Sequence, residues 1–229
     1  YETELFIKRY NLPVKFNRYA RTVDFNYEVS RSLAACEGAL LLVDCTQGIQ
    51  AQTLANVYLA INEDVTIIPV LNKIDSPNAQ TERVTNEITS MLGYKKDEIL
   101  KVSAKTGEGV EELIKEIINT IPPPKGDSTN SLQALVFDSK YDQFKGVIAY
   151  VKIVNAELQK GQSVISMGSN KNFEALETGI FSPKLKEIDK LRLGEVGYIA
   201  TGLKNLSDCR VGETITFKDY PSKEPLKGY

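Results

Sequence analysis

The apolar run Val65–Leu71, Val-Thr-Ile-Ile-Pro-Val-Leu, is followed at once by the polar turn Asn72–Asp75, Asn-Lys-Ile-Asp. A continuous apolar run of this length is typical of a strand that is buried on both faces of a parallel sheet. After one intervening helical segment, a second apolar run, Ile99–Val102, ends in the turn Ser103–Lys105. Ligands of such sheets bind at the carboxyl ends of the strands, so the pattern predicts a binding site formed by both turns.

The two turns carry the groups that recognition of a guanine base requires. Guanine presents N1–H and a 2-amino group on one edge, and a single carboxylate accepts both in a bidentate pair, the role predicted for Asp75. The main-chain N–H of Ala104 is predicted to donate to the guanine O6 atom. Adenine has the opposite donor pattern and would leave Asp75 unpaired, so we expect discrimination by several kcal/mol.

Four further residues complete the candidate guanine site. The stems of Lys73 and Lys105 are predicted to lie over the two faces of the base, beside Asn72 and Ser103. Alternatively, Asn-Lys-x-Asp is an ordinary turn sequence, because Asn and Asp favour turns. The second turn in the matching structural context favours the guanine interpretation. We assign no catalytic residue and no metal ligand, and GTP or GDP is the predicted ligand.

Composition narrows the classes of function. The formal net charge of −2 gives no global field that attracts nucleic acid, and we expect no DNA partner. The chain has no histidine, which excludes imidazole catalysis and histidine-bound metals within it. Its three cysteines lack ligand spacing and are predicted to be small buried residues of a protein from a reducing compartment. The apolar runs are too short to cross a bilayer.

Two patterns divide the chain. Residues 23–121 alternate helical and strand periods, which predicts a parallel sheet with helices on both faces, an α/β fold. Residues 122–130 begin with three prolines and are predicted to be an extended linker. Short β-rich runs in residues 131–218 are typical of a small antiparallel β-barrel. Residues 219–229 are predicted to be a truncated connection, and residues 1–22 match neither pattern.

Periodicity within the first part predicts four helices and three strands. The last helix begins after Gly109. The other helices and the strands are, in chain order, Asp24–Glu37, Gly38–Asp44, Ile49–Asn62, Val65–Leu71, Ala79–Leu92 and Ile99–Val102.

Strings in both parts resemble the LepA family of translational GTPases, also called elongation factor 4. They are Val23–Leu40, Gln47–Thr53, Val70–Asp75, Ile121–Pro124, Leu135–Ser139, Asp142–Val147 and Gly194–Tyr198. The resemblance covers residues 23–229 and implies the later part of a P-loop-type GTP-binding domain followed by the β-barrel, called domain II. It further implies GTP hydrolysis on elongating ribosomes, with the barrel docked on rRNA of the small subunit, and peripheral membrane association.

The resemblance also bears on location. Leu135–Ser139 and Asp142–Val147 are more similar to the organellar branch of the family, which implies the mitochondrial matrix and association with the inner membrane. A bacterial or plastid compartment is the alternative.

Two motifs of the family are absent. The chain has no Gly-x-x-x-x-Gly-Lys-Ser/Thr loop, which holds the phosphates and Mg²⁺ in an intact member. The family's Asp-Thr-Pro-Gly-His is replaced by Arg18, Tyr19, Ala20, Arg21 and Thr22. We therefore expect weak nucleotide binding and no ribosome-stimulated hydrolysis by this chain.

Several alternatives stay open. The chain, which begins at Tyr1, is expected to be a truncated or misassembled product, or joined parts of a longer protein. It is a GTPase of the LepA type, a non-catalytic ribosome-binding module or an inactive fragment. Tyr141, Phe144 and Tyr150 are candidates for stacking on RNA bases or for the barrel core and rim. Asp44, at the end of the first strand, is predicted to be structural.

Overall fold

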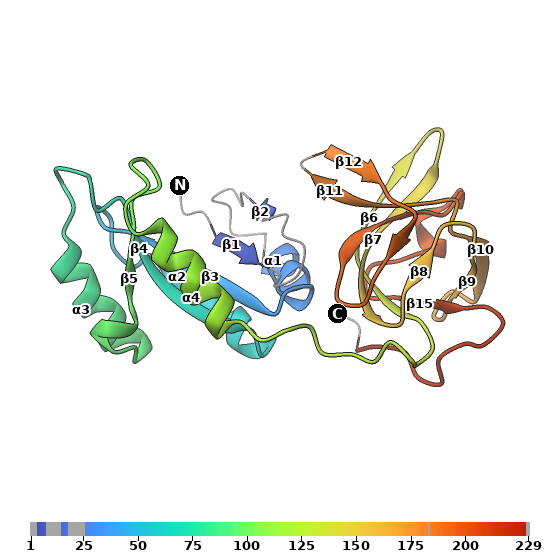
Figure 1. The fold of residues 1–229 in the computed structure, drawn as a ribbon, viewed down its shortest axis with the longest axis horizontal. Helices are drawn as coiled ribbons and strands as arrows, with labels where there is room; N and C mark the ends of the chain where they lie inside the picture. The colour runs from blue at the N-terminus through green and yellow to red at the C-terminus, as the bar shows by residue number, and fades with distance from the viewer. Residues whose placement is uncertain (1–3, 8–14, 18–25, 183, 228–229) are drawn as a thin grey trace. The chain divides into compact units, whose positions relative to one another are not determined.

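The chain forms two compact units, Tyr1–Pro123 (unit 1) and Pro124–Tyr229 (unit 2). The computed structural model describes residues 4–7, 15–17, 26–182 and 184–227, and Figure 1 shows both units as a ribbon. Residues 1–22, which match neither sequence pattern, therefore lie largely outside the described residues.

Unit 1 is built on a five-stranded sheet of order β2-β1-β3-β4-β5. β3 (Gly38–Asp44), β4 (Thr66–Asn72) and β5 (Leu100–Lys101) are parallel, as predicted. β1 (Glu4–Ile7) and β2 (Lys15–Asn17) extend the sheet beyond β3 as antiparallel strands. This antiparallel pair was not predicted, because the sequence before the first predicted helix matched no pattern.

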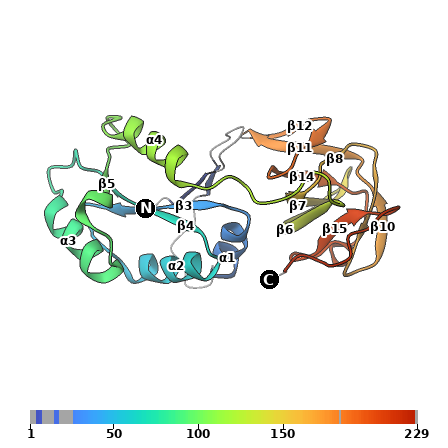
Figure 2. The ribbon, with the colours of Figure 1, turned by 60° about the horizontal axis from the view of Figure 1, so that its bottom comes forward.

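Helices cover both faces of the sheet of unit 1. Figure 2 shows α1 (Asn26–Ala34), α2 (Ala51–Asn62) and α3 (Thr81–Leu92) on one side, and α4 (Val110–Thr120) on the other. A short 3-10 helix, η1 (Lys96–Glu98), precedes β5. The predicted mixed α/β class with flanking helices is confirmed.

Alternation along the strands explains the two-sided core, because neighbouring residues of a strand point to opposite faces. Leu41 and Leu71 pack on the side of α2 and α3, with Val57, Val84 and Ile88. Leu40 and Val70 pack on the side of α4, with Leu113, Ile117 and Ile121. Both faces of β3 and β4 are thus buried, which is why these strands are apolar at consecutive positions.

Three apolar residues of α3 and α4 are half exposed. They are Met91 of α3 and Ile114 and Ile118 of α4, with exposed fractions of 53%, 48% and 45%. α4 packs on the sheet through Leu113 and Ile117. Ile114 and Ile118 follow these residues by one position, and therefore lie on the flank of the helix.

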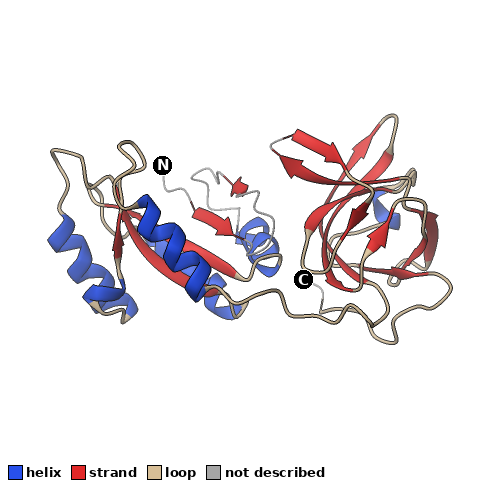
Figure 3. Cartoon of the chain, in the orientation of Figure 1, coloured by secondary structure: helices blue, strands red, loops and turns tan. Residues whose placement is uncertain are grey.

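Unit 2 is antiparallel and almost entirely strands and loops (Figure 3). An eight-stranded sheet has the order β10-β9-β15-β6-β7-β14-β11-β12, and β13 pairs with β8. The strands are β6 (Gln133–Asp142), β7 (Gly146–Asn155), β8 (Leu158–Gln159), β9 (Ser163–Ser166), β10 (Lys171–Glu174), β11 (Glu177–Ser182), β12 (Lys184–Glu187), β13 (Lys190–Leu191), β14 (Val196–Ala200) and β15 (Thr214–Phe217). η2 (Leu206–Asp208) is a single 3-10 turn.

One hydrophobic core serves the whole of unit 2. Val136 of β6, Val151 of β7, Ile199 of β14 and Ile215 of β15 are fully buried in the same cluster. The cluster also contains Val164 of β9, and Ile180 of β11 packs against it. Because four strands separate β9 from β11 in the sheet order, a shared interior requires the sheet to curl. This agrees with the predicted antiparallel β-rich second part.

Gly109 sets the start of α4 and the path of the loop that carries Ser103–Lys105. Its φ is +72°, and a Cβ atom there would lie 2.1 Å from the carbonyl oxygen of Lys101. The backbone angle disfavours a side chain at this position, and the space does not admit one.

We therefore expect Gly109→Ala to destabilise unit 1 by clearly more than Gly107→Ala. Gly107 has a φ of +86° but no atom within 4 Å of a Cβ. The control thus carries only the strain of the left-handed conformation, roughly 1–2 kcal/mol. Urea unfolding of both variants measures the difference, and equal losses would contradict the steric argument.

Candidate functional site

The carboxyl ends of the three parallel strands bring the predicted turns together. Asp44 of β3 and Asn72 of β4 are paired in register. The main-chain N–H of Val102 donates to Leu71 (2.8 Å), and that of Ile74 donates to Val102 (3.4 Å). The turns that begin at Asn72 and Ser103 are consequently neighbours, although they are 31 positions apart in the sequence.

Two side-chain hydrogen bonds join the turns directly. The hydroxyl of Ser103 donates to Oδ1 of Asp75 at 2.6 Å. The main-chain N–H of Ala104 donates to Oδ1 of Asn72 at 3.1 Å. Together with Lys73, whose own N–H donates to the same Asn72 oxygen at 2.8 Å, these contacts link five of the six predicted site residues. The sixth, Lys105, is exposed on the second turn.

Asp75 is oriented and remains accessible. Ser103, which holds it, is fully buried, and its Oγ also accepts the N–H of Thr106 at 3.1 Å. The Asp75 side chain is exposed, and its Oδ2 atom has no hydrogen-bond partner among the residues that the structure describes. This geometry suits a carboxylate that receives two donors from a planar ligand edge.

The main-chain N–H of Ala104, which the sequence predicts to donate to the guanine O6 atom, donates to Asn72 in the structure. Its contact with a base stays a prediction. Use of this N–H by a base therefore requires it to be shared with, or released by, Asn72.

Lys73 is held at both its backbone and its ammonium group. Its φ is +66°, an uncommon value for a residue with a side chain. Its Nζ lies 2.5 Å from Oδ2 of Asp44, and the Lys73 side chain is 46% exposed whereas Asp44 is 6% exposed. The stem therefore runs along the carboxyl edge of the sheet.

Asp44 lies next to the candidate site. Its pairing with Lys73 was not predicted from the sequence. It accepts the N–H and the hydroxyl of Thr46 at 2.8 and 2.7 Å, and Nε2 of Gln47 at 3.4 Å. Burial by itself raises the pKa of Asp44, but the hydrogen bonds from Lys73 and Thr46 outweigh it, so the pKa lies below the ordinary value. The feature of the sequence that could have indicated this role is an acidic residue at the end of a buried strand.

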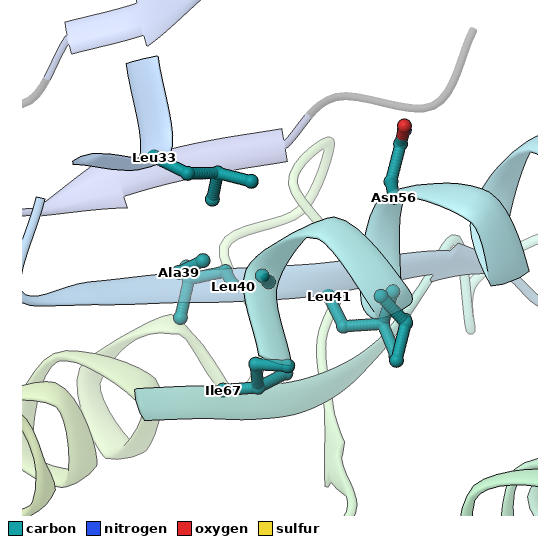
Figure 4. A pocket seen from close by; sticks show the side chains of 8 residues that line it. Leu33, Ala39, Leu40, Leu41, Asn56 and Ile67 are labelled. Atoms are coloured by element: carbon teal, nitrogen blue, oxygen red, sulfur yellow. The ribbon is translucent and has the colours of Figure 1, made fainter. Parts of the chain in front are cut away.

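A hollow, shown in Figure 4, lies between α1, α2 and the sheet. Its lining residues are Leu33, Ala39, Leu40, Leu41, Asn56, Val57, Ala60 and Ile67. Only Asn56 is polar, and none is titratable. The strand residues belong to the amino-terminal parts of β3 and β4, away from the predicted site, so this hollow offers no acid–base or nucleophilic chemistry.

Two searches of the described part of the chain complete the inventory. Its acidic residues and cysteines form no group of three or more suited to a metal ion. None of its helices has both the length and the apolar character needed to span a bilayer.

Comparison with known proteins gives the same assignment as the turns. Residues 22–123 match the family model described as the elongation factor Tu GTP binding domain. The chain is 53% identical over 207 residues to elongation factor 4 of Clostridioides difficile and 54% identical over 207 residues to that of Geobacillus thermodenitrificans. By sequence, the chain is a relative of the elongation factor 4 proteins. The predicted resemblance is confirmed.

The match covers a larger share of this chain than of the two relatives. The match spans 90% of this chain but 34% of each of the two relatives, so the chain spans about a third of their length. A similar fold is found in translation elongation factor SelB from Methanococcus maripaludis, apo form, with a TM-score of 0.68 and 22% identity. That alignment covers 81% of this chain and 41% of SelB.

The relatives also bear on location. The two elongation factor 4 proteins named above are bacterial, which agrees with the bacterial alternative. The mitochondrial matrix and inner-membrane association stay predictions.

The lowered pKa of Asp44 predicts a pH dependence of stability. A carboxyl group with a depressed pKa contributes stability above its unfolded pKa, and this contribution is lost as the pH falls through the folded value. We expect Asp44→Asn to destabilise unit 1 at neutral pH, and the difference from the wild type to shrink below about pH 4.

NMR-detected urea unfolding of β3 and β4 amides at a series of pH values measures this difference. Other carboxylates titrate in both proteins and cancel in the comparison. A difference that stays constant from pH 7 to about pH 2 would contradict the assignment.

Proposed function

We propose that this chain carries the guanine-recognising part of a ribosome-associated translational GTPase of the elongation factor 4 type. The single observation that supports this most is the Asp75 carboxylate, oriented by Ser103 where the two turns meet. GTP or GDP is the proposed ligand, and action on elongating ribosomes is the proposed role of the whole protein.

The base is proposed to enter with its amino edge toward Asp75. N1–H and the 2-amino group donate to the two carboxylate oxygens, a strong arrangement because the acceptor is charged. Ala104 donates to O6 once Asn72 shares or releases its N–H. The stems of Lys73 and Lys105 cover the faces of the base. Adenine has no donor pair for Asp75 and is rejected.

Phosphate chemistry is proposed to need residues outside this sequence. The 229 residues contain no Gly-x-x-x-x-Gly-Lys-Ser/Thr loop, the element that holds the phosphates and Mg²⁺ in P-loop GTPases. Binding by this chain itself therefore rests on contacts with the base. We expect weak affinity and no ribosome-stimulated GTP hydrolysis.

Base specificity tests this proposal. We expect the chain to bind GMP in preference to AMP, and Asp75→Asn to shift the preference from GMP to xanthosine monophosphate. Xanthine keeps N1–H but carries an oxygen at position 2, which matches one acceptor and one donor of a side-chain amide. NMR titration of the amides of both turns measures the three affinities.

Asp97→Asn is the matched control. Asp97 is exposed and lies in η1, which precedes β5 and so lies at the opposite end of that strand. It should leave all three affinities unchanged. Unaltered GMP preference in the Asp75→Asn chain would refute the role of this carboxylate.

A non-catalytic ribosome-binding role of unit 2 is the second candidate, and the turn between β6 and β7 favours it. Phe144 in this turn is 96% exposed. The Asp142 carboxylate accepts the N–H groups of Phe144 and Lys145 at 2.8 and 2.9 Å, which holds the turn rigid. Nζ of Lys145 lies 2.6 Å from both carboxylate oxygens of Glu177 on β11.

The three aromatic candidates for base stacking differ in exposure and in ring contacts. Tyr141 is 52% exposed, whereas Tyr150 packs edge-on against Phe181 at a centroid distance of 4.9 Å. A rigidly presented aromatic ring can stack on an unpaired base, because every base has a π face. We propose that unit 2 contacts rRNA of the small ribosomal subunit through Phe144.

We expect Phe144→Ala to weaken binding of the chain to small ribosomal subunits by about 1–3 kcal/mol, the range measured for one base–aromatic stack. Sedimentation with purified subunits at a fixed salt concentration measures it. Leu206→Ala removes another exposed apolar side chain of unit 2, 45% exposed, and should have no effect. Equal binding of both variants would exclude Phe144 as the contact.

A further inference from the structure

The ion pair between Asp44 and Lys73 has no assigned role in guanine recognition, although it lies within the proposed site. Asp44 ends β3, and its register partner Asn72 directly precedes Lys73. The carboxylate is nearly inaccessible to solvent, whereas the lysine it binds is half exposed. A buried carboxylate thus holds the ammonium of Lys73, whose stem is proposed to cover one face of the base.

Asp44 is a fixed anchor, because its own loop holds it independently of Lys73. Oδ1 accepts both the N–H and the hydroxyl of Thr46. The Asp44 carbonyl oxygen accepts the N–H groups of Gln47 and Gly48 at 3.1 and 2.9 Å. The carboxylate therefore keeps its position whether or not the lysine is present.

Lys73 is consequently held at both ends of its stem. Asn72 accepts its main-chain N–H, and Asp44 accepts its ammonium. A free lysine loses much of its rotamer freedom when it is laid along a base, and a lysine that is already ordered loses less. Ordering a side chain before binding raises affinity by removing this cost.

We propose that Asp44 is a positioning residue of the guanine site, which presets the Lys73 stem for contact with the face of the base. This inference rests on the function proposed above. Asp44 touches no part of the nucleotide itself and acts only through Lys73.

A double-mutant cycle separates positioning from a merely structural role. Asp44→Asn keeps the shape of the side chain and its acceptor for Thr46, but removes the charge. Lys73→Met keeps an unbranched apolar stem without the ammonium. The four proteins, wild type, D44N, K73M and the double variant, are titrated with GMP and AMP by NMR.

We expect D44N to weaken GMP binding roughly 3- to 10-fold, the cost of ordering one long side chain. In the K73M background, D44N should cause no further loss, because its effect passes through Lys73. Glu177→Gln is the matched control, since it disrupts a comparable lysine–carboxylate pair in unit 2 and should leave GMP binding unchanged. Thermal unfolding confirms that each variant is folded at the titration temperature.

A measurement without nucleotide tests the ordering of Lys73 directly. Side-chain NMR relaxation at Cε should show an ordered Lys73 in the wild type and a mobile one in D44N, with Lys105 as the mobile reference. A Lys73 that is equally mobile in both proteins overturns the inference.

The remaining outcomes are also decisive. GMP affinity that D44N leaves unchanged, or lowers equally in both backgrounds, overturns the positioning role while the proposed function stands. No preference of the wild-type chain for GMP over AMP overturns the proposed function, and this inference with it.

Discussion

The parallel pairing of β3, β4 and β5 is the constraint on which the candidate site depends. It aligns Asp44 with Asn72 and connects Val102 to Leu71, so that three strand ends meet at one edge. Each strand contributes a different part of the site. Without this register, the two turns of the candidate site would be separate polar loops, and neither alone could orient a carboxylate for a bidentate pair.

Burial of both faces of the sheet maintains that register. A slip of one residue in β4 would move Val70 and Leu71 to the opposite faces and away from their helices. Because helices cover both sides, no alternative register keeps the same apolar contacts. The precision of the exposed turns is therefore a consequence of the core beneath them.

The polar groups of the candidate site pair with one another. The Ala104 N–H bonds to Asn72, the Lys73 ammonium to Asp44, and one oxygen of Asp75 to Ser103. Such pairing satisfies these polar groups and also orders them. Recognition of a base by this edge would then require one exchange, at Ala104, rather than assembly of the whole site.

The sequence alone was sufficient for the strands of the parallel sheet, the four helices and the two turns, because apolar periodicity and turn composition are local signals. It also indicated the resemblance to elongation factor 4 through contiguous strings. In unit 2 it predicted the β-rich runs Gln133–Phe137, Gly146–Val154, Gln162–Met167, Gly194–Gly202 and Glu213–Phe217. These runs miss β8, β10, β11, β12 and β13, and four of the missed strands have only two to four residues, too few for an apolar run.

Only the tertiary structure decided the partner of the Lys73 ammonium, the acceptor of the Ala104 N–H and the exposure of Ile114. Asp44 and Lys73 are 29 positions apart, and Ala104 and Asn72 are 32 apart. Contacts across such separations depend on strand register and helix placement. These are properties of the packed chain as a whole, which no short stretch of sequence contains.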